Sequence, residues 1–205
     1  IREAARLLGS SAPCAILYAL ETVERDLRTS CVRSLVSFSL VTGSLGNKSG
    51  GLFPLYSGTN EQGSKDVGCG PGHLPGYRPV TMKESRNQVR DAWKCTELPS
   101  EIGLSVTQIT SAIEEGRLKA LLIIGDSPNF TNGELGGFIE ALKNLEFLVV
   151  QDTFAGKLTE AADVVLPSAT FAENLGTYTN MERRVQLLRP VLGSRGDEDA
   201  DWRIL

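Results

Sequence analysis

Two short apolar runs joined by an amphipathic segment constrain the fold more than any other feature of the chain. Residues 118–124 and 147–150 are rich in Leu, Ile and Val, and they end at Gly125-Asp126 and Gln151-Asp152. Residues 134–144 between them have the pattern of a helix of about three turns. Two buried strands joined by a helix form a βαβ unit, which implies parallel pairing and a right-handed crossover. The chain is therefore predicted to be an α/β protein with a Rossmann-like parallel sheet and flanking helices.

The spacing of apolar residues before and after this βαβ unit predicts further helices and strands. The spacing of apolar residues predicts helices over 1–9, 22–41 and 83–94, and a short buried strand over 15–19. Ser105-Val-Thr-Gln108 is a capping box, so a helix is expected to begin there and to stop at Gly116. A third apolar run, residues 162–166, ends at Pro167.

A long glycine-rich loop is predicted over residues 43–76, which contain ten of the 21 glycines. Loops of this length in compact domains are functional or serve as linkers, and its apolar residues favour an ordered loop. An irregular connection between subdomains explains the composition equally well. We expect residues 1–58 to form the end of one α/β domain with the start of this loop. Residues 59–205 are expected to form a second, dinucleotide-binding α/β domain, truncated at its C-terminal end.

Charge and cysteine content exclude several classes of partner. The net charge of −4 gives no reason to expect nucleic acid, and no apolar run approaches the length needed for membrane insertion. The four cysteines, at 14, 31, 69 and 95, have no metal-site spacing and are expected to be buried or half-buried small thiols.

Ile1 is not a start methionine, so the chain is expected to be an internal fragment of a larger multidomain protein. A cytoplasmic location is the default expectation.

The carboxyl ends of neighbouring parallel strands meet at one edge of a sheet. Gly125-Asp126-Ser127 and Gln151-Asp152-Thr153 are therefore expected to lie side by side. A carboxylate in this place can accept hydrogen bonds from a ribose or a base. The same residue types also cap helices, so the position alone leaves both roles open. Neither a GxGxxG fingerprint nor a Walker A motif is present in the sequence.

The order of motifs resembles that of the molybdopterin oxidoreductase family, and in particular its formate dehydrogenase branch. The C-terminal motifs that carry this resemblance are Asp152-Thr-Phe, Ala161-Ala-Asp-Val-Val-Leu-Pro167, Phe171-Ala-Glu-Asn-Leu-Gly-Thr-Tyr-Thr-Asn180 and Glu182-Arg-Arg-Val-Gln186. Asn60-Glu-Gln-Gly-Ser-Lys-Asp-Val-Gly68 and Leu74-Pro-Gly-Tyr77 resemble the glycine-rich segment of that branch. The resemblance implies a bis-molybdopterin guanine dinucleotide that carries molybdenum or tungsten.

Carried onto this chain, the resemblance implies six cofactor-binding residues and no catalytic or metal-ligating ones. They are Gly125, Asp126, Gln151, Asp152, Asn174 and Asp201. It also implies that the iron–sulfur cluster and the metal's protein ligand lie outside this sequence. Asn180, Glu182 and Arg183 are expected either to hold their loop, with a buried Arg–carboxylate pair, or to touch the cofactor.

Four positions depart from the family pattern. In the formate dehydrogenases that this chain resembles, an arginine and a glutamine face the metal and substrate. At the matching positions this chain has Tyr56 and Gly58. Ala19 and Val23 stand where some relatives have a methionine and a glutamine. Since Tyr56 supplies no fixed positive charge, formate is an unexpected substrate.

The resemblance implies a cofactor-binding portion of a formate dehydrogenase-like enzyme that performs two-electron redox chemistry. Its expected partners are a small-molecule substrate, the rest of its own polypeptide and electron-transfer subunits. The alternative is a structural or electron-conduit subunit of the complex I type, which keeps the fold without molybdenum. The four departures favour this alternative, whereas Asp152, Asn174 and Asp201 favour the enzyme.

Overall fold

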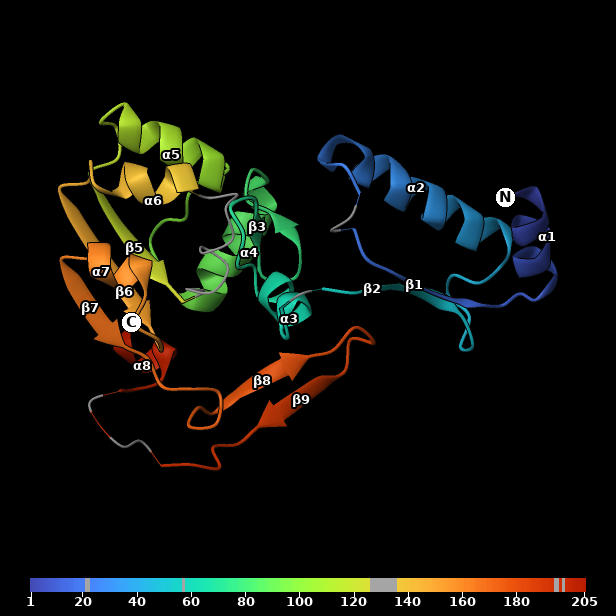
Figure 1. Cartoon of the computed structure of the whole chain (residues 1–205). Coiled ribbons are helices and arrows are strands. Elements are labelled where there is room, and N and C mark those ends of the chain that lie inside the picture. The colour runs from blue at the N-terminus through green and yellow to red at the C-terminus, as the bar shows by residue number, and fades with distance from the viewer. Residues whose placement is uncertain (21–22, 57, 126–135, 194–195, 197) are drawn as a thin grey trace. The chain divides into compact units, whose positions relative to one another are not determined.

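The computed structural model describes residues 1–20, 23–56, 58–125, 136–193, 196 and 198–205 (Figure 1). These residues form two compact units. Unit 1 comprises Ile1–Gly63 with Tyr178–Gln186, and unit 2 comprises Ser64–Thr177 with Leu187–Leu205. The division into domains at residues 58 and 59 stays a prediction.

Unit 1 is built on a small βαβ arrangement. Helix α1 (Arg2–Ser10) precedes strand β1 (Ala15–Tyr18), helix α2 (Arg25–Val41) and strand β2 (Gly51–Pro54). The two strands pair in parallel, with Ala15 opposite Gly51. The prediction of a short buried strand over 15–19 is confirmed for the strand and was wrong for its burial, because every residue of β1 is exposed or half-buried. A pair of only two strands leaves both of its edges and much of its surface without a covering layer.

The glycine-rich region contains regular structure, contrary to the prediction of one long loop. It includes β2, helix α3 (Glu61–Asp66) and strand β3 (His73–Leu74), which pairs antiparallel with β4 (Arg78–Pro79). Asn60 fixes the start of α3 to a distant segment, because its Oδ1 accepts a hydrogen bond from the Thr179 backbone N–H at 2.9 Å. Gly63 packs directly against the same Asn60 side chain.

Unit 2 contains the predicted parallel sheet. Helices α4 (Lys83–Trp93) and α5 (Val106–Glu114) precede strand β5 (Ala120–Ile124), helix α6 (Gly136–Leu142), strand β6 (Phe147–Asp152), helix α7 (Lys157–Ala161) and strand β7 (Val164–Pro167). The strand order is β5-β6-β7, and both pairings are parallel. The predicted capping box at the start of α5 is confirmed: the Ser105 hydroxyl accepts from the Gln108 N–H, and the Gln108 side chain accepts from the Ser105 N–H at 2.8 Å.

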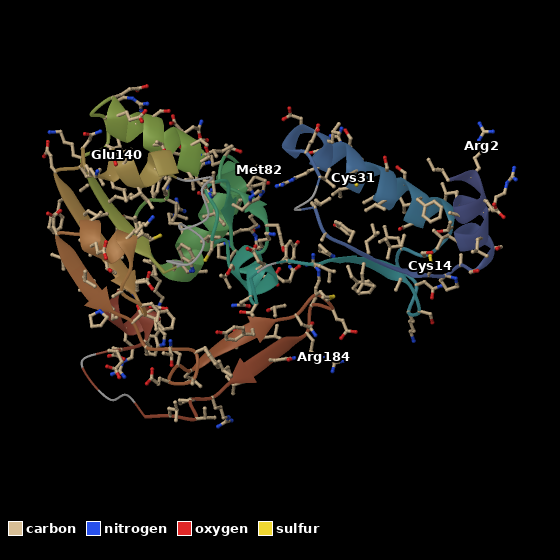
Figure 2. All side chains as sticks on the ribbon, viewed as in Figure 1. Arg2, Cys14, Cys31, Met82, Glu140 and Arg184 are labelled. Carbon is tan, nitrogen blue, oxygen red and sulfur yellow. The ribbon has the colours of Figure 1, made fainter. Side chains whose placement is uncertain are left out.

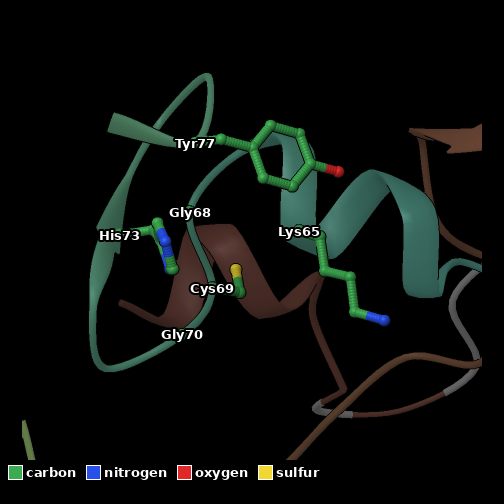
Figure 3. A pocket seen from close by; sticks show the side chains of 6 residues that line it. All are labelled: Lys65, Gly68, Cys69, Gly70, His73 and Tyr77. Carbon is green, nitrogen blue, oxygen red and sulfur yellow. The ribbon is translucent and has the colours of Figure 1, made fainter. Parts of the chain in front are cut away.

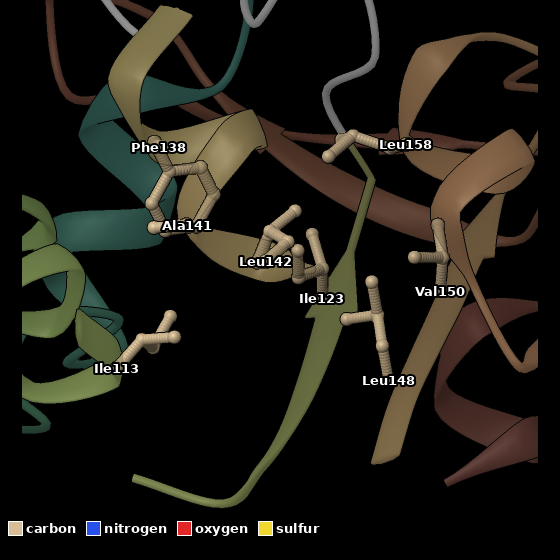
Figure 4. Packing of buried hydrophobic residues seen from close by; sticks show 8 residues of the cluster. All are labelled: Ile113, Ile123, Phe138, Ala141, Leu142, Leu148, Val150 and Leu158. Carbon is tan, nitrogen blue, oxygen red and sulfur yellow. The ribbon is translucent and has the colours of Figure 1, made fainter. Parts of the chain in front are cut away.

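One face of this sheet holds the core of unit 2. Ile123 of β5 and Leu148 and Val150 of β6 pack against Ile113 of α5, Leu158 of α7 and three residues of α6 (Figure 4). The α6 residues are Phe138, Ala141 and Leu142. Alternation along the strands leaves Leu122, Ile124 and Phe147 on the opposite face, where each is 45–47% exposed. The prediction that residues 118–124 are buried therefore holds for one face only.

A hairpin contains the loop of Asn180, Glu182 and Arg183. Strand β8 (Gly176–Thr179) pairs with β9 (Val185–Leu188). Asn180 shapes the turn, since its Oδ1 accepts from the N–H groups of Glu182 and Arg184 at 3.0 and 2.9 Å. Arg183 adopts a left-handed φ of 62°. Glu182 and Arg183 are both exposed, so the first of their two expected roles, a buried Arg–carboxylate pair, was wrong. Arg184 lies at the same exposed turn (Figure 2).

The last helix along the chain is α8 (Asp201–Ile204). Among the described residues, no helix combines the length and apolar character that crossing a membrane requires. Cys14, Cys31 and Cys95 are half-buried free thiols as expected, but Cys69 is exposed.

Candidate cofactor site

The carboxyl edge of the β5-β6-β7 sheet brings the predicted strand-end residues together. The Gly125 N–H donates to the Gln151 carbonyl oxygen at 2.7 Å, and Gly125 adopts a φ of +68°, which side chains disfavour. On the other side, the Ser168 N–H donates to the Asp152 carbonyl oxygen at 3.0 Å. The ends of all three strands are thus tied by backbone hydrogen bonds into one continuous edge.

Helix α8 closes this edge, which periodicity could not predict. Ser168, just after β7, forms a parallel bridge with Asp199, just before α8. The fully buried Gln151 side chain donates through Nε2 to the Asp201 carboxylate at 2.8 Å and to the Asp201 carbonyl oxygen at 3.3 Å. Residues 50 positions apart in the sequence therefore lie in direct contact.

The edge gathers buried polar atoms that have no hydrogen-bond partner among the described residues. Five such side-chain atoms occur in the described part of the chain, and four of them belong to this region: Gln151 Oε1, Asp152 Oδ2, Ser168 Oγ and Asn174 Oδ1. A buried polar atom without a partner costs about 1–3 kcal/mol. Such a cluster is expected where a bound molecule supplies the missing hydrogen bonds.

The orientation of these groups is fixed by their other hydrogen bonds. Asn174 Nδ2 donates to the Ala169 carbonyl oxygen at 3.0 Å, so its Oδ1 is the atom without a partner. Asp152 Oδ1 accepts from the Phe154 N–H at 3.1 Å, which leaves Oδ2. Three of the four atoms are pure acceptors, and the fourth is a hydroxyl. A ligand at this edge must therefore present several N–H or O–H donors.

The structure brings together most of the residues that the sequence singled out. Gln151, Asp152 and Asp201 lie at the edge together with Gly125, and Asn174 lies in the segment that follows β7. Asp126 lies outside the described residues. Ser168 was missed; its position directly after Pro167, where β7 ends, was the available signal.

A separate pocket in unit 1 joins the glycine-rich segment to the hairpin turn. It encloses about 230 Å³, and it includes Tyr56 and Gly58. The other lining residues are Pro54, Thr59, Glu61, Gln62, Thr179, Asn180 and Met181. Lys, Arg and His are absent from the described residues of this lining. The pocket thus offers hydroxyl, amide and carboxylate groups, but no fixed positive charge.

A third pocket, in unit 2, combines a thiol with an imidazole. Cys69 and His73 line about 230 Å³ together with Lys65 and Tyr77 (Figure 3). The Tyr77 hydroxyl donates to Asp66 Oδ1 at 2.8 Å and so holds this wall in place. The described residues contain no group of three or more His, Cys, Asp or Glu side chains that could hold a metal ion.

A parallel α/β sheet with buried acceptors at its carboxyl edge has the architecture of nucleotide-binding proteins. Sequence comparison defines the class further. The model of the molybdopterin oxidoreductase family matches residues 7–205, and the chain belongs to that family.

Three relatives show where in the family the similarity lies. The chain is 38% identical over its full length to the F420-dependent formate dehydrogenase 2 subunit alpha of Methanococcus maripaludis, of which it covers 30%. It is 37% identical to the NADPH-Fe(3+) oxidoreductase subunit alpha of Geobacter sulfurreducens, covering 24%, and 33% identical to formate dehydrogenase H of Escherichia coli, covering 29%. Both matches extend over the whole of this chain. The chain thus spans less than a third of each of these proteins.

Proposed function

We propose that the intact protein is a formate dehydrogenase-like molybdopterin oxidoreductase. In this proposal, the carboxyl edge of the β5-β6-β7 sheet binds the nucleotide end of a molybdopterin guanine dinucleotide. The observation that carries the proposal is the cluster of four buried polar atoms without partners at that edge. Family membership supports the choice of cofactor.

The acceptor character of the cluster favours a guanosine. Guanine carries an N2 amino group that donates hydrogen bonds, and a ribose diol adds two hydroxyl donors. Asp152 Oδ2 suits these donors best, since a carboxylate forms charge-assisted hydrogen bonds. Gln151 Oε1 and Asn174 Oδ1 provide further acceptors. Asp201 acts through Gln151, whose amide it orients at 2.8 Å.

When bound, the cofactor supplies two-electron redox chemistry through its molybdenum or tungsten and its pterins. The residues of this chain contribute binding and orientation. The rigid strand ends hold one end of the cofactor in a fixed position, and burial at the edge excludes water from the hydrogen bonds.

Direct chemical analysis of the purified intact protein tests this proposal. We expect molybdenum or tungsten by elemental analysis and, after acid hydrolysis, about two guanosine monophosphates per metal, as a bis-dinucleotide requires. A protein with metal and pterin but no guanosine monophosphate would contradict the nucleotide assignment while leaving a molybdopterin enzyme. A cytidine nucleotide would contradict the assignment of the base.

A second candidate is a structural or electron-conduit subunit of the complex I type. The pocket lined by Tyr56 and Gly58 favours it, because no described residue of its lining supplies the positive charge that would hold a carboxylate substrate. This candidate predicts an intact protein that assembles normally without metal or pterin. The partnerless acceptors of unit 2 would then be filled by protein or water, and their substitution would leave function unchanged.

The choice of substrate and partners follows from the relatives only by analogy. Two of the three are named as alpha subunits, so we propose that electron-transfer subunits and a small-molecule substrate complete the system. Relatives at nearly equal identity are named for formate and for Fe(3+). Turnover assays with formate as substrate and with Fe(3+) as electron acceptor distinguish these possibilities.

A further inference from the structure

A polar pocket on α4 lies apart from the cofactor edge and has no assigned role. It encloses about 280 Å³ in unit 2. One wall is a single face of α4, where Lys83, Arg86, Asn87 and Arg90 follow one another at helical spacing. The facing wall comprises Thr96, Glu97, Leu98 and Ser100.

The backbone after α4 creates the second wall. Lys94 adopts a left-handed conformation, with φ 55°, and the Cys95 N–H donates back to the Arg90 carbonyl oxygen at 3.2 Å. This ending turns the chain, so that residues 96–100 return alongside the helix. The pocket is therefore a feature of the fold rather than a chance gathering of mobile side chains.

Two of the three cations in this pocket have no carboxylate partner among the described residues. Arg86 is half-buried, and its Nη1 donates to the Val80 carbonyl oxygen at 2.7 Å. This bond holds the guanidinium in place without neutralising it. No ion pair joins Lys83 to a described carboxylate either, whereas Arg90 pairs with Asp91 at 3.0 Å. Arg86 is partly removed from water without a counter-charge, which is unfavourable, so an anion beside it would stabilise this arrangement.

We propose that the α4 pocket binds a phosphate group. Three cations and the single carboxylate of Glu97 give the lining a formal charge of +2. A phosphomonoester carries a charge of about −2 at pH 7. The hydroxyls of Thr96 and Ser100 add neutral donors from the facing wall, and the Asn87 amide adds one from α4, which suits a tetrahedral oxyanion. Arginine is also the side chain that best matches phosphate geometry.

Titration of the intact protein with inorganic phosphate tests the assignment. Binding is measured by calorimetry at constant ionic strength, so that general screening does not contribute. We expect saturable binding that weakens about tenfold or more in Arg86→Gln, since a charge-assisted hydrogen bond is lost. Lys83→Gln should weaken binding as well. Because Lys83 is exposed and lacks a described partner, this variant is expected to fold normally even if loss of the Val80 contact destabilises Arg86→Gln.

Matched controls separate this site from others. Lys143→Gln removes a cation just after α6 that is paired with Glu140 at 2.7 Å, and it should leave phosphate binding unchanged. Adenosine monophosphate is titrated in the same way. Binding tighter than that of inorganic phosphate would indicate a phosphorylated organic ligand that also contacts Leu98, whereas equal binding would indicate free phosphate. Equal phosphate binding in wild type, Lys83→Gln and Arg86→Gln would overturn the proposal. So would binding of polyglutamate, but not phosphate, at Lys83 and Arg86.

Discussion

Asp152 divides its two carboxylate oxygens between the fold and the proposed ligand. Oδ1 accepts the Phe154 N–H and holds the turn that leaves β6, whereas Oδ2 is buried without a described partner. A single side chain thus has one structural and one available acceptor. Substitutions that keep the Oδ1 acceptor and change the Oδ2 acceptor therefore isolate the proposed role of Asp152 in binding.

Asp152→Asn is predicted to impair cofactor retention with little effect on the turn. An asparagine can still accept from Phe154, but its amide replaces the charged Oδ2 acceptor with an N–H donor. We expect a loss of about 1.5–3 kcal/mol of binding free energy, the usual contribution of a hydrogen bond to a charged group. Nucleotide and metal content of the purified intact protein after extensive dialysis measure this loss.

Asp152→Ala provides the comparison, because it removes both acceptors. It should release the cofactor as readily as Asp152→Asn and should also lower the unfolding temperature. Full nucleotide occupancy in both variants would show that Asp152 does not contact the cofactor.

At the strand ends, the sequence was sufficient to predict which residues meet. The βαβ pattern alone placed Gln151 and Asp152 beside Gly125, because parallel strands must align their carboxyl ends. The pattern contained no information on Asp201, which meets Gln151 from 50 positions away. Its assignment depended on the family resemblance. Ser168 was missed because an isolated serine after Pro167 has no periodic signal.

Among the helices and strands, the sequence predicted best those features that depend on a few neighbouring residues. The start of α5 depends on two side chains within four residues, and the capping box formed as expected. The hairpin β8–β9 depends instead on pairing between strands and on a turn that Asn180 organises through two backbone N–H groups. Its small and polar residues resembled a loop, and the turn contains no glycine to signal the positive φ of Arg183.

Ser105→Ala is predicted to destabilise α5 by about 1 kcal/mol, the typical cost of losing an N-cap side chain. The substitution removes the Ser105 hydroxyl that accepts from the Gln108 N–H. Amide hydrogen exchange over residues 105–110 measures the fraying. Thr110→Ala is the matched control: it lies in the same helix, and alanine has the higher helix propensity. Equal exchange rates in both variants would contradict a capping role.

Gly63→Ala is predicted to separate α3 from the hairpin. The added methyl group would occupy the place of Asn60 Oδ1, the atom that accepts the Thr179 N–H. Forcing a methyl into a packed site costs about 1–3 kcal/mol. A lower unfolding temperature and faster proteolysis near residues 58–63 are expected. Gly9→Ala, where a methyl meets nothing within 4 Å, should cause neither.

For the whole molecule, the most consequential feature is the incompletely covered face of the β5-β6-β7 sheet. Parallel sheets are normally covered on both faces. Here α5, α6 and α7 cover one face. On the other face Gln151 is buried in contact with Asp201 at the carboxyl end, while Leu122, Ile124 and Phe147 remain 45–47% exposed. Periodicity predicted apolar strands correctly, but it could not distinguish one covered face from two. That distinction depends on what packs against the sheet.

The 205-residue chain expressed alone is therefore predicted to self-associate, because contiguous exposed apolar surface drives association. Sedimentation velocity over a range of protein concentrations should show a sedimentation coefficient that rises with concentration. Replacing Leu122 and Ile124 together by lysine places two charges on the exposed part of this face without touching the Ile123 side. The double variant should remain monomeric at concentrations where the unmodified chain associates. Monomeric behaviour of the unmodified chain throughout the concentration range would show that this exposed apolar face does not drive self-association. Association that persists in the double variant would place the contact on another surface.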